Sequence, residues 1–197
     1  MDENKNLYII AGCNGAGKTT ASYNVLPNIL DCKEFVNADE IAKGLSPFNV
    51  ESVAVQAGRL MLERIDSLMG RGVSFSIETT LATKSYSSMV SHAKNLGYRV
   101  FLFYFWLETP ELAKQRVLHR VLNGGHNIPE EVIVRRYYNG IKNLFNIFMG
   151  IVDEWMIFDN SETQSVMIAK GSHGASPTIK KIDIFNKLKK IANEQVG

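Results

Sequence analysis

Short apolar runs alternate along the chain with longer segments in which apolar residues recur every three or four positions. The short runs are rich in β-branched and aromatic residues, which predicts strands. They cover residues 7–11, 34–39, 73–78, 98–107 and 155–159, and a further run at 166–169 is expected to pair with the last of them as a hairpin. The run at 98–107 is the most apolar, which is typical of a strand buried on both faces of a sheet.

The longer segments predict amphipathic helices between the strands. They cover residues 20–26, 51–69, 84–96, 111–122 and 130–148, with a short helix from Glu40 and a last one whose apolar face carries Ile182, Phe185, Leu188 and Ile191. Pro27 and Gly97 are placed to end two of these helices, and Thr109 is placed to cap another. Strands that alternate with helices predict an α/β fold with a mainly parallel sheet.

Length and composition predict one globular domain. The 197 residues are 45% hydrophobic and 21% charged, which suits a single domain over residues 1–197 and excludes disordered and fibrous classes. The net charge of +2 is too small to indicate a nucleic acid or a membrane surface as partner. Cys13 and Cys32 lack the spacing of a metal site and are too few for a disulfide scaffold, so we expect a reducing, cytoplasmic location. The polar segment at residues 1–6 predicts no signal peptide, and the apolar run at 100–107 is too short to cross a bilayer.

The strongest motif follows the first predicted strand. It reads Gly12-Cys13-Asn14-Gly15-Ala16-Gly17-Lys18-Thr19, followed by Thr20, and fits the pattern G-x-x-x-x-G-K-[ST] at every fixed position. The glycines allow backbone N–H groups to turn inward around the phosphates of a nucleotide. Lys18 adds a positive charge at the β- and γ-phosphates, and the Thr19 hydroxyl can hold Mg²⁺. Because the motif lies between a strand and a helix, the sequence predicts a nucleoside triphosphate site rather than an ordinary glycine-rich turn.

Two carboxylates are predicted at the carboxyl ends of neighbouring strands. Asp39 ends the second strand, and Glu78 ends the third and is followed by Thr79 and Thr80. Ligands of open parallel sheets bind outside these strand ends, so we expect all four residues to contact a substrate. Both carboxylates have a structural alternative, since each could instead cap the helix that follows it.

Arginines flank a glycine-rich break between two predicted helices. Arg116 and Arg120 lie before the break at residues 123–129, and Arg135 and Arg136 lie after it. Two helices hinged at residues 116–136 are typical of a mobile lid, and arginine binds phosphate through two parallel hydrogen bonds. As an alternative, any one of these arginines could be a solvated charge of a helical hairpin. His126 within the break is expected to make loop hydrogen bonds rather than to act in catalysis.

Together these parts predict a small-molecule kinase. Phosphoryl transfer to an alcohol requires a phosphate cradle, Mg²⁺, a carboxylate at the acceptor hydroxyl and cations on the γ-phosphoryl group. Closing a lid would exclude the water that otherwise hydrolyses the donor. A GTPase switch would need a guanine-reading N-K-x-D stretch, which the sequence lacks. A motor ATPase would need an aspartate before Glu108, where Leu107 stands.

Several motifs taken together resemble the zeta-toxin-like kinases. They are the phosphate loop, Phe35-Val36-Asn37-Ala38-Asp39, Glu78-Thr79-Thr80-Leu81, Gly124-Gly125-His126-Asn127-Ile128-Pro129 and Phe158-Asp159-Asn160-Ser161. The resemblance covers nearly the whole chain, in order and at the right spacing. It implies a fold like that of the nucleoside monophosphate kinases, a three-layer α/β/α P-loop NTPase with a mainly parallel five-stranded sheet of order 2-3-1-4-5 and a helical lid. It also implies ATP-dependent phosphorylation of UDP-N-acetylglucosamine at a sugar hydroxyl.

The same resemblance implies roles for individual residues. Asp39 would be the base that accepts the hydroxyl proton, and Glu78 would bind the acceptor hydroxyl. Lys18 with Thr19 would hold the phosphates and Mg²⁺. The expected lid arginines are Arg120 and Arg136, with Arg116 and Arg135 as substitutes.

Position 13 departs from the family, in which proline is often found there. The Cys13 side chain is expected to point away from the N–H cradle and to pack in the core, so nucleotide binding should survive. As an alternative, a thiol near a helix N-terminus could be acidified and open to oxidation.

Two other functions stay open from the sequence. The chain could be a nucleotide-dependent switch or binding module, held by an antitoxin protein that covers its site. It could also phosphorylate polynucleotide ends, although the small net charge and the lack of interleaved basic and aromatic residues argue against nucleic acid.

Overall fold

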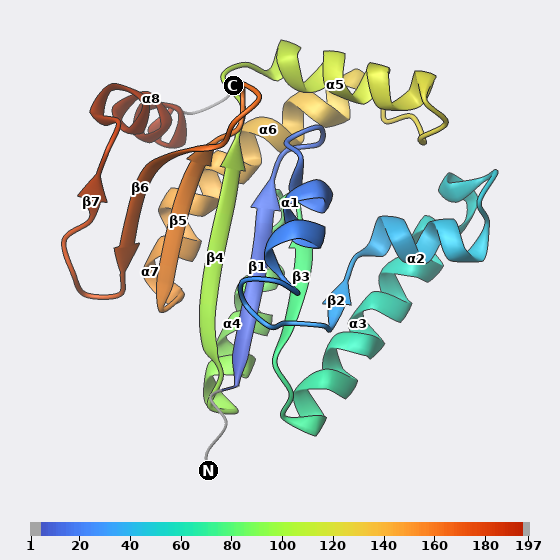
Figure 1. Cartoon of the computed structure of the whole chain (residues 1–197), viewed down its shortest axis with the longest axis horizontal. Helices are drawn as coiled ribbons and strands as arrows, with labels where there is room; N and C mark the ends of the chain where they lie inside the picture. The colour runs from blue at the N-terminus through green and yellow to red at the C-terminus, as the bar shows by residue number, and fades with distance from the viewer. Residues whose placement is uncertain (1–4, 195–197) are drawn as a thin grey trace.

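A seven-stranded sheet forms the centre of the molecule (Figure 1). The computed structural model describes residues 5–194, so most of the polar segment at residues 1–6 lies outside the described part. The strands are β1 (Asn6–Gly12), β2 (Phe35–Val36), β3 (Phe75–Thr79), β4 (Arg99–Trp106), β5 (Glu154–Asp159), β6 (Val166–Ser172) and β7 (Thr178–Ile179). Their order across the sheet is β2-β3-β1-β4-β5-β6-β7.

The first five strands are parallel and have the order 2-3-1-4-5 that the resemblance implies. The predicted fold class is therefore confirmed. The expected number of five strands is corrected to seven, because β6 and β7 extend the sheet beyond β5 by antiparallel pairing. The hairpin of β5 and β6 was predicted, but the two residues of β7 are too few to produce a hydrophobic pattern of their own.

Helices cover both faces and one edge of the sheet (Figure 1). They are α1 (Lys18–Val25), α2 (Ala38–Leu45), α3 (Ala54–Arg71), α4 (Tyr86–Asn95), α5 (Pro110–Leu122), α6 (Glu130–Asn143), α7 (Met149–Ile151) and α8 (Ile182–Asn193), with a 3-10 turn at Val50–Val53 and a π-helical turn at Leu144–Phe148. Helix α1 lies on one face of the sheet, and α4 and α6 lie on the other. Helices α2 and α3 form a helical arm at the β2 edge, and α5 crosses above the carboxyl ends of the parallel strands.

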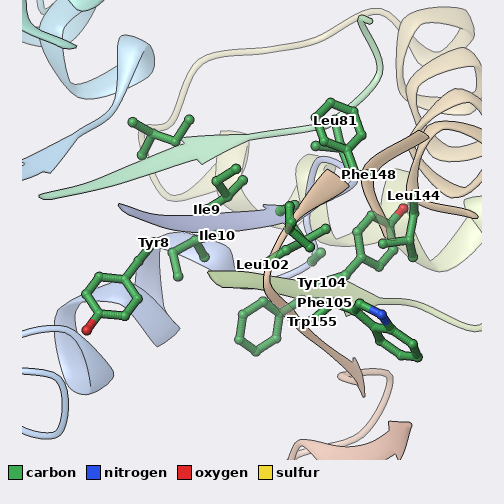
Figure 2. Close-up of a cluster of buried hydrophobic side chains, with 14 of the residues drawn as sticks. Tyr8, Ile9, Ile10, Leu81, Leu102, Tyr104, Phe105, Leu144, Phe148 and Trp155 are labelled. Atoms are coloured by element: carbon green, nitrogen blue, oxygen red, sulfur yellow. The ribbon is translucent and has the colours of Figure 1, made fainter. Parts of the chain in front are cut away.

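Buried side chains of the central strands β1 and β4 form part of the core (Figure 2). Ile9 and Leu102 are opposite each other in the register of these strands, and with Tyr104 they are at most 1% exposed. Figure 2 shows Leu81 and Phe148 in the same cluster of buried side chains. Strands buried on both faces consist almost entirely of apolar residues, which is why β4 was recognisable in the sequence.

The start of α2 differs from the sequence prediction. The second strand ends at Val36 instead of continuing to Asp39, and the helix begins at Ala38 instead of Glu40. Asn37 is the N-cap, because its Oδ1 accepts hydrogen bonds from the backbone N–H groups of Asp39 at 2.8 Å and of Glu40 at 3.4 Å. Asp39 is therefore neither a strand end nor a cap, and lies in the first turn of α2, where the helix dipole favours a carboxylate.

The other boundaries differ from the predictions by a few residues. The helix predicted at 51–69 is a 3-10 turn followed by α3, and the one predicted at 130–148 is α6 followed by the π-helical turn. Gly97 follows α4 with a φ of 84°, and Thr109 caps α5 as predicted. Within residues 5–194, no helix combines the length and apolar character that crossing a bilayer requires.

Replacing Thr109 by alanine is expected to lower the free energy of unfolding by about 1 kcal/mol, because its side chain accepts the Leu112 N–H bond at the start of α5. For a chain of this size the thermal midpoint should fall by roughly 2–4 °C. Thr109→Ser keeps the hydroxyl and serves as the matched control. Calorimetry of both variants checks the prediction, and equal midpoints for the two would contradict it.

Candidate active site

The phosphate loop connects β1 to α1 at the carboxyl edge of the sheet. Gly15 and Gly17 both have a φ of 79°, a left-handed conformation that glycine adopts without strain. Gly17 is also the N-cap residue of α1, and it has no side chain that could accept a hydrogen bond from that helix start. The first N–H groups of α1 therefore suit a phosphate as their acceptor.

The carboxylate of Glu78 contacts three residues beside this loop. Its Oε2 accepts hydrogen bonds from the Thr19 hydroxyl at 2.8 Å and from Asn37 Nδ2 at 2.9 Å. Lys18 Nζ lies 3.7 Å from Glu78 Oε1 and donates to the Cys13 carbonyl at 2.9 Å. The lysine and the glutamate are both nearly buried, so their charges stabilise each other in place of water. We call these four residues (Glu78, Thr19, Asn37 and Lys18) the Glu78 cluster.

Two cavities meet at the Glu78 cluster. The larger has a volume of about 570 Å³ and lies between the phosphate loop, the start of α2 and the end of α5. The smaller has a volume of about 240 Å³ and lies between the start of α2, the segment after β3 and α6. Four residues line both cavities: Asn14, Lys18, Asp39 and Glu78.

Most of the candidate site residues predicted from the sequence line one or both cavities. The loop residues that line the larger cavity are Asn14, Gly15, Gly17, Lys18, Thr19 and Thr20. Thr79 and Thr80 line the smaller one. Three predicted nucleotide-binding residues are buried parts of the loop motif and line neither cavity: Gly12, Cys13 and Ala16.

Asp39 reaches both cavities from the first turn of α2. Its Oδ2 lies 3.9 Å from Nε2 of His126, which belongs to the glycine-rich break after α5. Burial lowers the pKa of His126, and the negative charge of Asp39 opposes that shift. Burial therefore favours the neutral form of the imidazole. Its Nδ1 is buried and finds no hydrogen-bond partner within residues 5–194, so the ring does not make the loop hydrogen bond expected of it there.

Three of the four predicted arginines reach the cavities. Arg120 lines the larger cavity and donates to the His126 carbonyl at 3.2 Å. Arg136 lines the smaller cavity and donates to Asn14 Oδ1 at 3.2 Å. Burial lowers the pKa of Arg136, while the charge of Asp39 opposes that shift. Arg135 is exposed and lines neither cavity.

Arg116 lines the larger cavity and fixes the turn after β5. It donates to the carbonyls of Asn160 at 2.8 Å and Ser161 at 2.7 Å. Asn160 Nδ2 in turn donates to the Ala16 carbonyl at 2.8 Å, and any Cβ at Gly17 would lie 2.6 Å from that nitrogen. In the sequence this turn was one motif of the family resemblance, and the Asn160 bond was not predicted.

Asn37 was also missed. The sequence signal was an asparagine three residues before the predicted helix start at Glu40, and asparagine is a preferred cap residue. For Asn160, the signal was a polar triplet directly after a buried strand.

Oxygen ligands that suit Mg²⁺ are present in the larger cavity. The Thr19 hydroxyl and the Glu78 carboxylate are 2.8 Å apart and both line it. Within residues 5–194, no group of three His, Cys, Asp or Glu side chains is placed to bind a metal. Mg²⁺ commonly binds one or two protein oxygens together with waters and substrate phosphates. These residues therefore fit a Mg²⁺ ion that binds together with a nucleotide.

Comparison with known proteins identifies the family. The family model described as Zeta toxin matches residues 1–170. The chain belongs to the zeta toxin family. An uncharacterized protein of Haemophilus influenzae is 31% identical to it over 137 residues, which is 68% of this chain and 94% of that protein.

Solved structures of low sequence identity share the fold. The AvrRxo1-ORF1:-ORF2 complex with ATP matches with a TM-score of 0.76 and 18% identity over 98% of this chain and 66% of that chain. The chain thus spans about two thirds of the length of the matched chain in that complex. The PezAT toxin–antitoxin system of Streptococcus pneumoniae matches with a TM-score of 0.66 and 18% identity over 98% of this chain and 87% of that chain. These likenesses agree with the P-loop kinase fold.

Cys13 lies in the core behind the loop, and burial raises its pKa to about 11. The alternative of an acidified thiol is therefore wrong. At pH 8 only about one such thiol in a thousand is ionised, so we predict that iodoacetamide leaves Cys13 unmodified in the folded protein and alkylates it after unfolding in urea. Cys32 is buried as well, so we expect neither thiol to react in the folded protein and both to react after unfolding. Intact-mass spectrometry checks this, and rapid modification of native Cys13 would contradict it.

Proposed function

We propose that this chain is a kinase that transfers the γ-phosphoryl group of ATP to a hydroxyl of a small acceptor, with UDP-N-acetylglucosamine as the first candidate. The observation that carries the proposal is the pair of cavities that share Lys18, Asp39 and Glu78. A kinase has to bring a phosphate chain and an acceptor hydroxyl into contact while excluding water. Two cavities that open onto the same lysine and carboxylates meet that requirement.

The larger cavity is assigned to ATP. Its phosphates would accept hydrogen bonds from the N–H groups of the phosphate loop and from Lys18, and Arg120 would approach from the other side. Mg²⁺, held by Thr19 and the phosphates, would neutralise charge on the group being transferred. The glycine-rich break after α5 carries Asn123, Gly124, Gly125 and His126 at the rim of this cavity, where we propose that a lid closes.

The smaller cavity is assigned to the acceptor hydroxyl. Hydroxyl-bearing side chains line it: Thr79, Thr80, Thr83 and Tyr86. In the proposed step the Asp39 carboxylate accepts the hydroxyl proton, and the acceptor oxygen forms a bond to the γ-phosphorus. The bond from that phosphorus to the β-phosphate oxygen breaks, and ADP leaves. Arg136, on the same cavity, would stabilise negative charge on the transferred group.

Glu78 has a double assignment in this proposal. Its Oε2 already accepts two hydrogen bonds within the Glu78 cluster, so Oε1 is the atom left to receive an acceptor hydroxyl. Its charge also keeps Lys18 in place beside the phosphate loop.

We propose a cytoplasmic location for the protein. The proposed reaction uses ATP, and both cysteines of the chain are free thiols.

A second candidate is a nucleotide-dependent module whose site is covered by an antitoxin protein. Phe48, three residues after α2, is fully exposed, and Leu122, the last residue of α5, is 77% exposed. We propose that an antitoxin covering the site would bury these two side chains. The Streptococcus pneumoniae relative is described as part of a toxin–antitoxin system.

The first experiment incubates the protein with Mg²⁺, γ-labelled ATP and a pool of small metabolites, followed by mass spectrometry. Labelled UDP-N-acetylglucosamine phosphate would support the donor, the acceptor and the reaction together. Label on another metabolite would keep the kinase and replace the acceptor. If only slow release of inorganic phosphate is found, the second candidate is preferred.

Replacing Asp39 by asparagine should lower kcat about 10²–10⁴-fold, because the general base is lost, while ATP binding is kept. Asp66→Asn is the matched control, since Asp66 is an exposed carboxylate of α3 and lines neither cavity. Initial rates of phosphoryl transfer and ATP titration calorimetry measure both effects. Transfer by Asp39→Asn at the wild-type rate would remove Asp39 as the base.

A further inference from the structure

Leu81 has a backbone conformation that leucine rarely adopts. Its φ is +58°, in the left-handed region that favours glycine. The residue cannot be replaced by glycine without loss, because its side chain is fully buried in the core cluster that also contains Leu144 and Phe148 (Figure 2). Strained residues of this kind persist only where the surrounding structure holds them.

Two hydrogen bonds hold Leu81 in this conformation. Its backbone N–H donates to the Thr79 hydroxyl oxygen at 3.0 Å. Its carbonyl accepts from Asn143 Nδ2 at 2.8 Å, across 62 positions of the chain. Asn143 is a buried polar residue at the end of α6. Its amide therefore fixes the backbone directly after Thr80, which lines the smaller cavity.

Arg136 and Gly140 share one face of α6 with Asn143. Arg136, Gly140 and Asn143 are spaced at i, i+4 and i+7, which places them in one line along a helix. Arg136 lines the smaller cavity. Gly140 allows α6 to approach closely, since any Cβ there would lie 2.7 Å from the Thr80 carbonyl oxygen.

Helix α6 is itself fixed to the sheet one residue after Arg136. The Tyr137 hydroxyl donates to the Leu107 carbonyl at 2.8 Å and accepts from Trp106 Nε1 at 3.0 Å. The distance between the Arg136 cation and the backbone at residues 80–81 is therefore set by one rigid element.

We propose that Asn143 is a positioning residue for the acceptor, an inference that rests on the kinase function proposed above. By holding the strained Leu81 backbone, Asn143 keeps in place the segment at residues 80–83, from which Thr80 and Thr83 line the smaller cavity. The same helix carries Arg136, so acceptor hydroxyls and transferred group are aligned by α6. Loss of the Asn143 amide then weakens acceptor binding and leaves the ATP cavity unchanged.

The test compares Asn143→Leu, which keeps the volume and removes the donor, with the wild type. The KM for UDP-N-acetylglucosamine is expected to rise about tenfold, because the Leu81 carbonyl loses its buried partner and the segment relaxes. The KM for ATP should stay within about twofold, a split that a general loss of folding would not produce. Asn146→Leu is the matched control, since Asn146 also donates from a side-chain amide but bonds to the Ala192 carbonyl, away from both cavities.

A second readout does not depend on any acceptor. Lys84 is exposed at the end of this segment, so native-state trypsin cleavage after Lys84 reports its opening. Asn143→Leu should be cleaved there several-fold faster than the wild type, and Asn146→Leu should not. Gly140→Ala, whose Cβ would displace the Thr80 carbonyl, should have the same effect on cleavage.

The outcomes separate this inference from the proposed function. A raised acceptor KM with faster cleavage in Asn143→Leu supports it. An unchanged acceptor KM overturns it, whatever the cleavage rate. If the wild type transfers nothing to UDP-N-acetylglucosamine, that acceptor is wrong, and cleavage alone decides: faster cleavage in Asn143→Leu but not in Asn146→Leu supports the role of Asn143, and equal rates overturn it.

Discussion

The buried carboxylate of Glu78 holds the site together. It is next to last in β3, accepts hydrogen bonds from Thr19 at the start of α1 and from Asn37 at the start of α2, and has the Lys18 ammonium group beside it. A carboxylate taken out of water costs free energy unless charges and donors replace the solvent. Here the replacement comes from separate elements of the chain. The strand, the phosphate loop and the helical arm are therefore positioned by one interaction.

Helix α6, on the face of the sheet opposite α1, fixes another side of the site. The sequence suggested that this helix is half of a mobile lid. In the structure its buried face, with Ile133, Tyr137 and Ile141, packs into the core, and the Tyr137 hydroxyl is bonded to the end of β4. Lid movement, which is our proposal, then concerns the end of α5 and the glycine-rich break. The cavity assigned to the acceptor is bounded by the fixed helix, and the cavity assigned to ATP is bounded by the break.

Most of the fold was predictable because its signals are local. The apolar run of β4, the cap at Thr109 and the phosphate-loop motif are each written in a few consecutive residues. Predictions failed where a side chain or a remote strand decided the outcome. The Asn37 side chain ends β2 early by capping α2, and β7 exists only because it pairs with the edge of β6. Neither effect leaves a periodic pattern of apolar residues.

The sequence by itself determined the chemical groups of the candidate site: the phosphate loop with Lys18, the carboxylates and a set of arginines. Only the tertiary structure decided how they are paired. Arg136 lines a cavity and Arg135 faces solvent, because consecutive residues of a helix point about 100° apart and packing selects the buried face. Thr19 and Glu78 are 59 positions apart, and their hydrogen bond forms only when the strands lie in register. The residue types determine which chemical groups are present, whereas the packing of distant elements determines which of these groups contact each other.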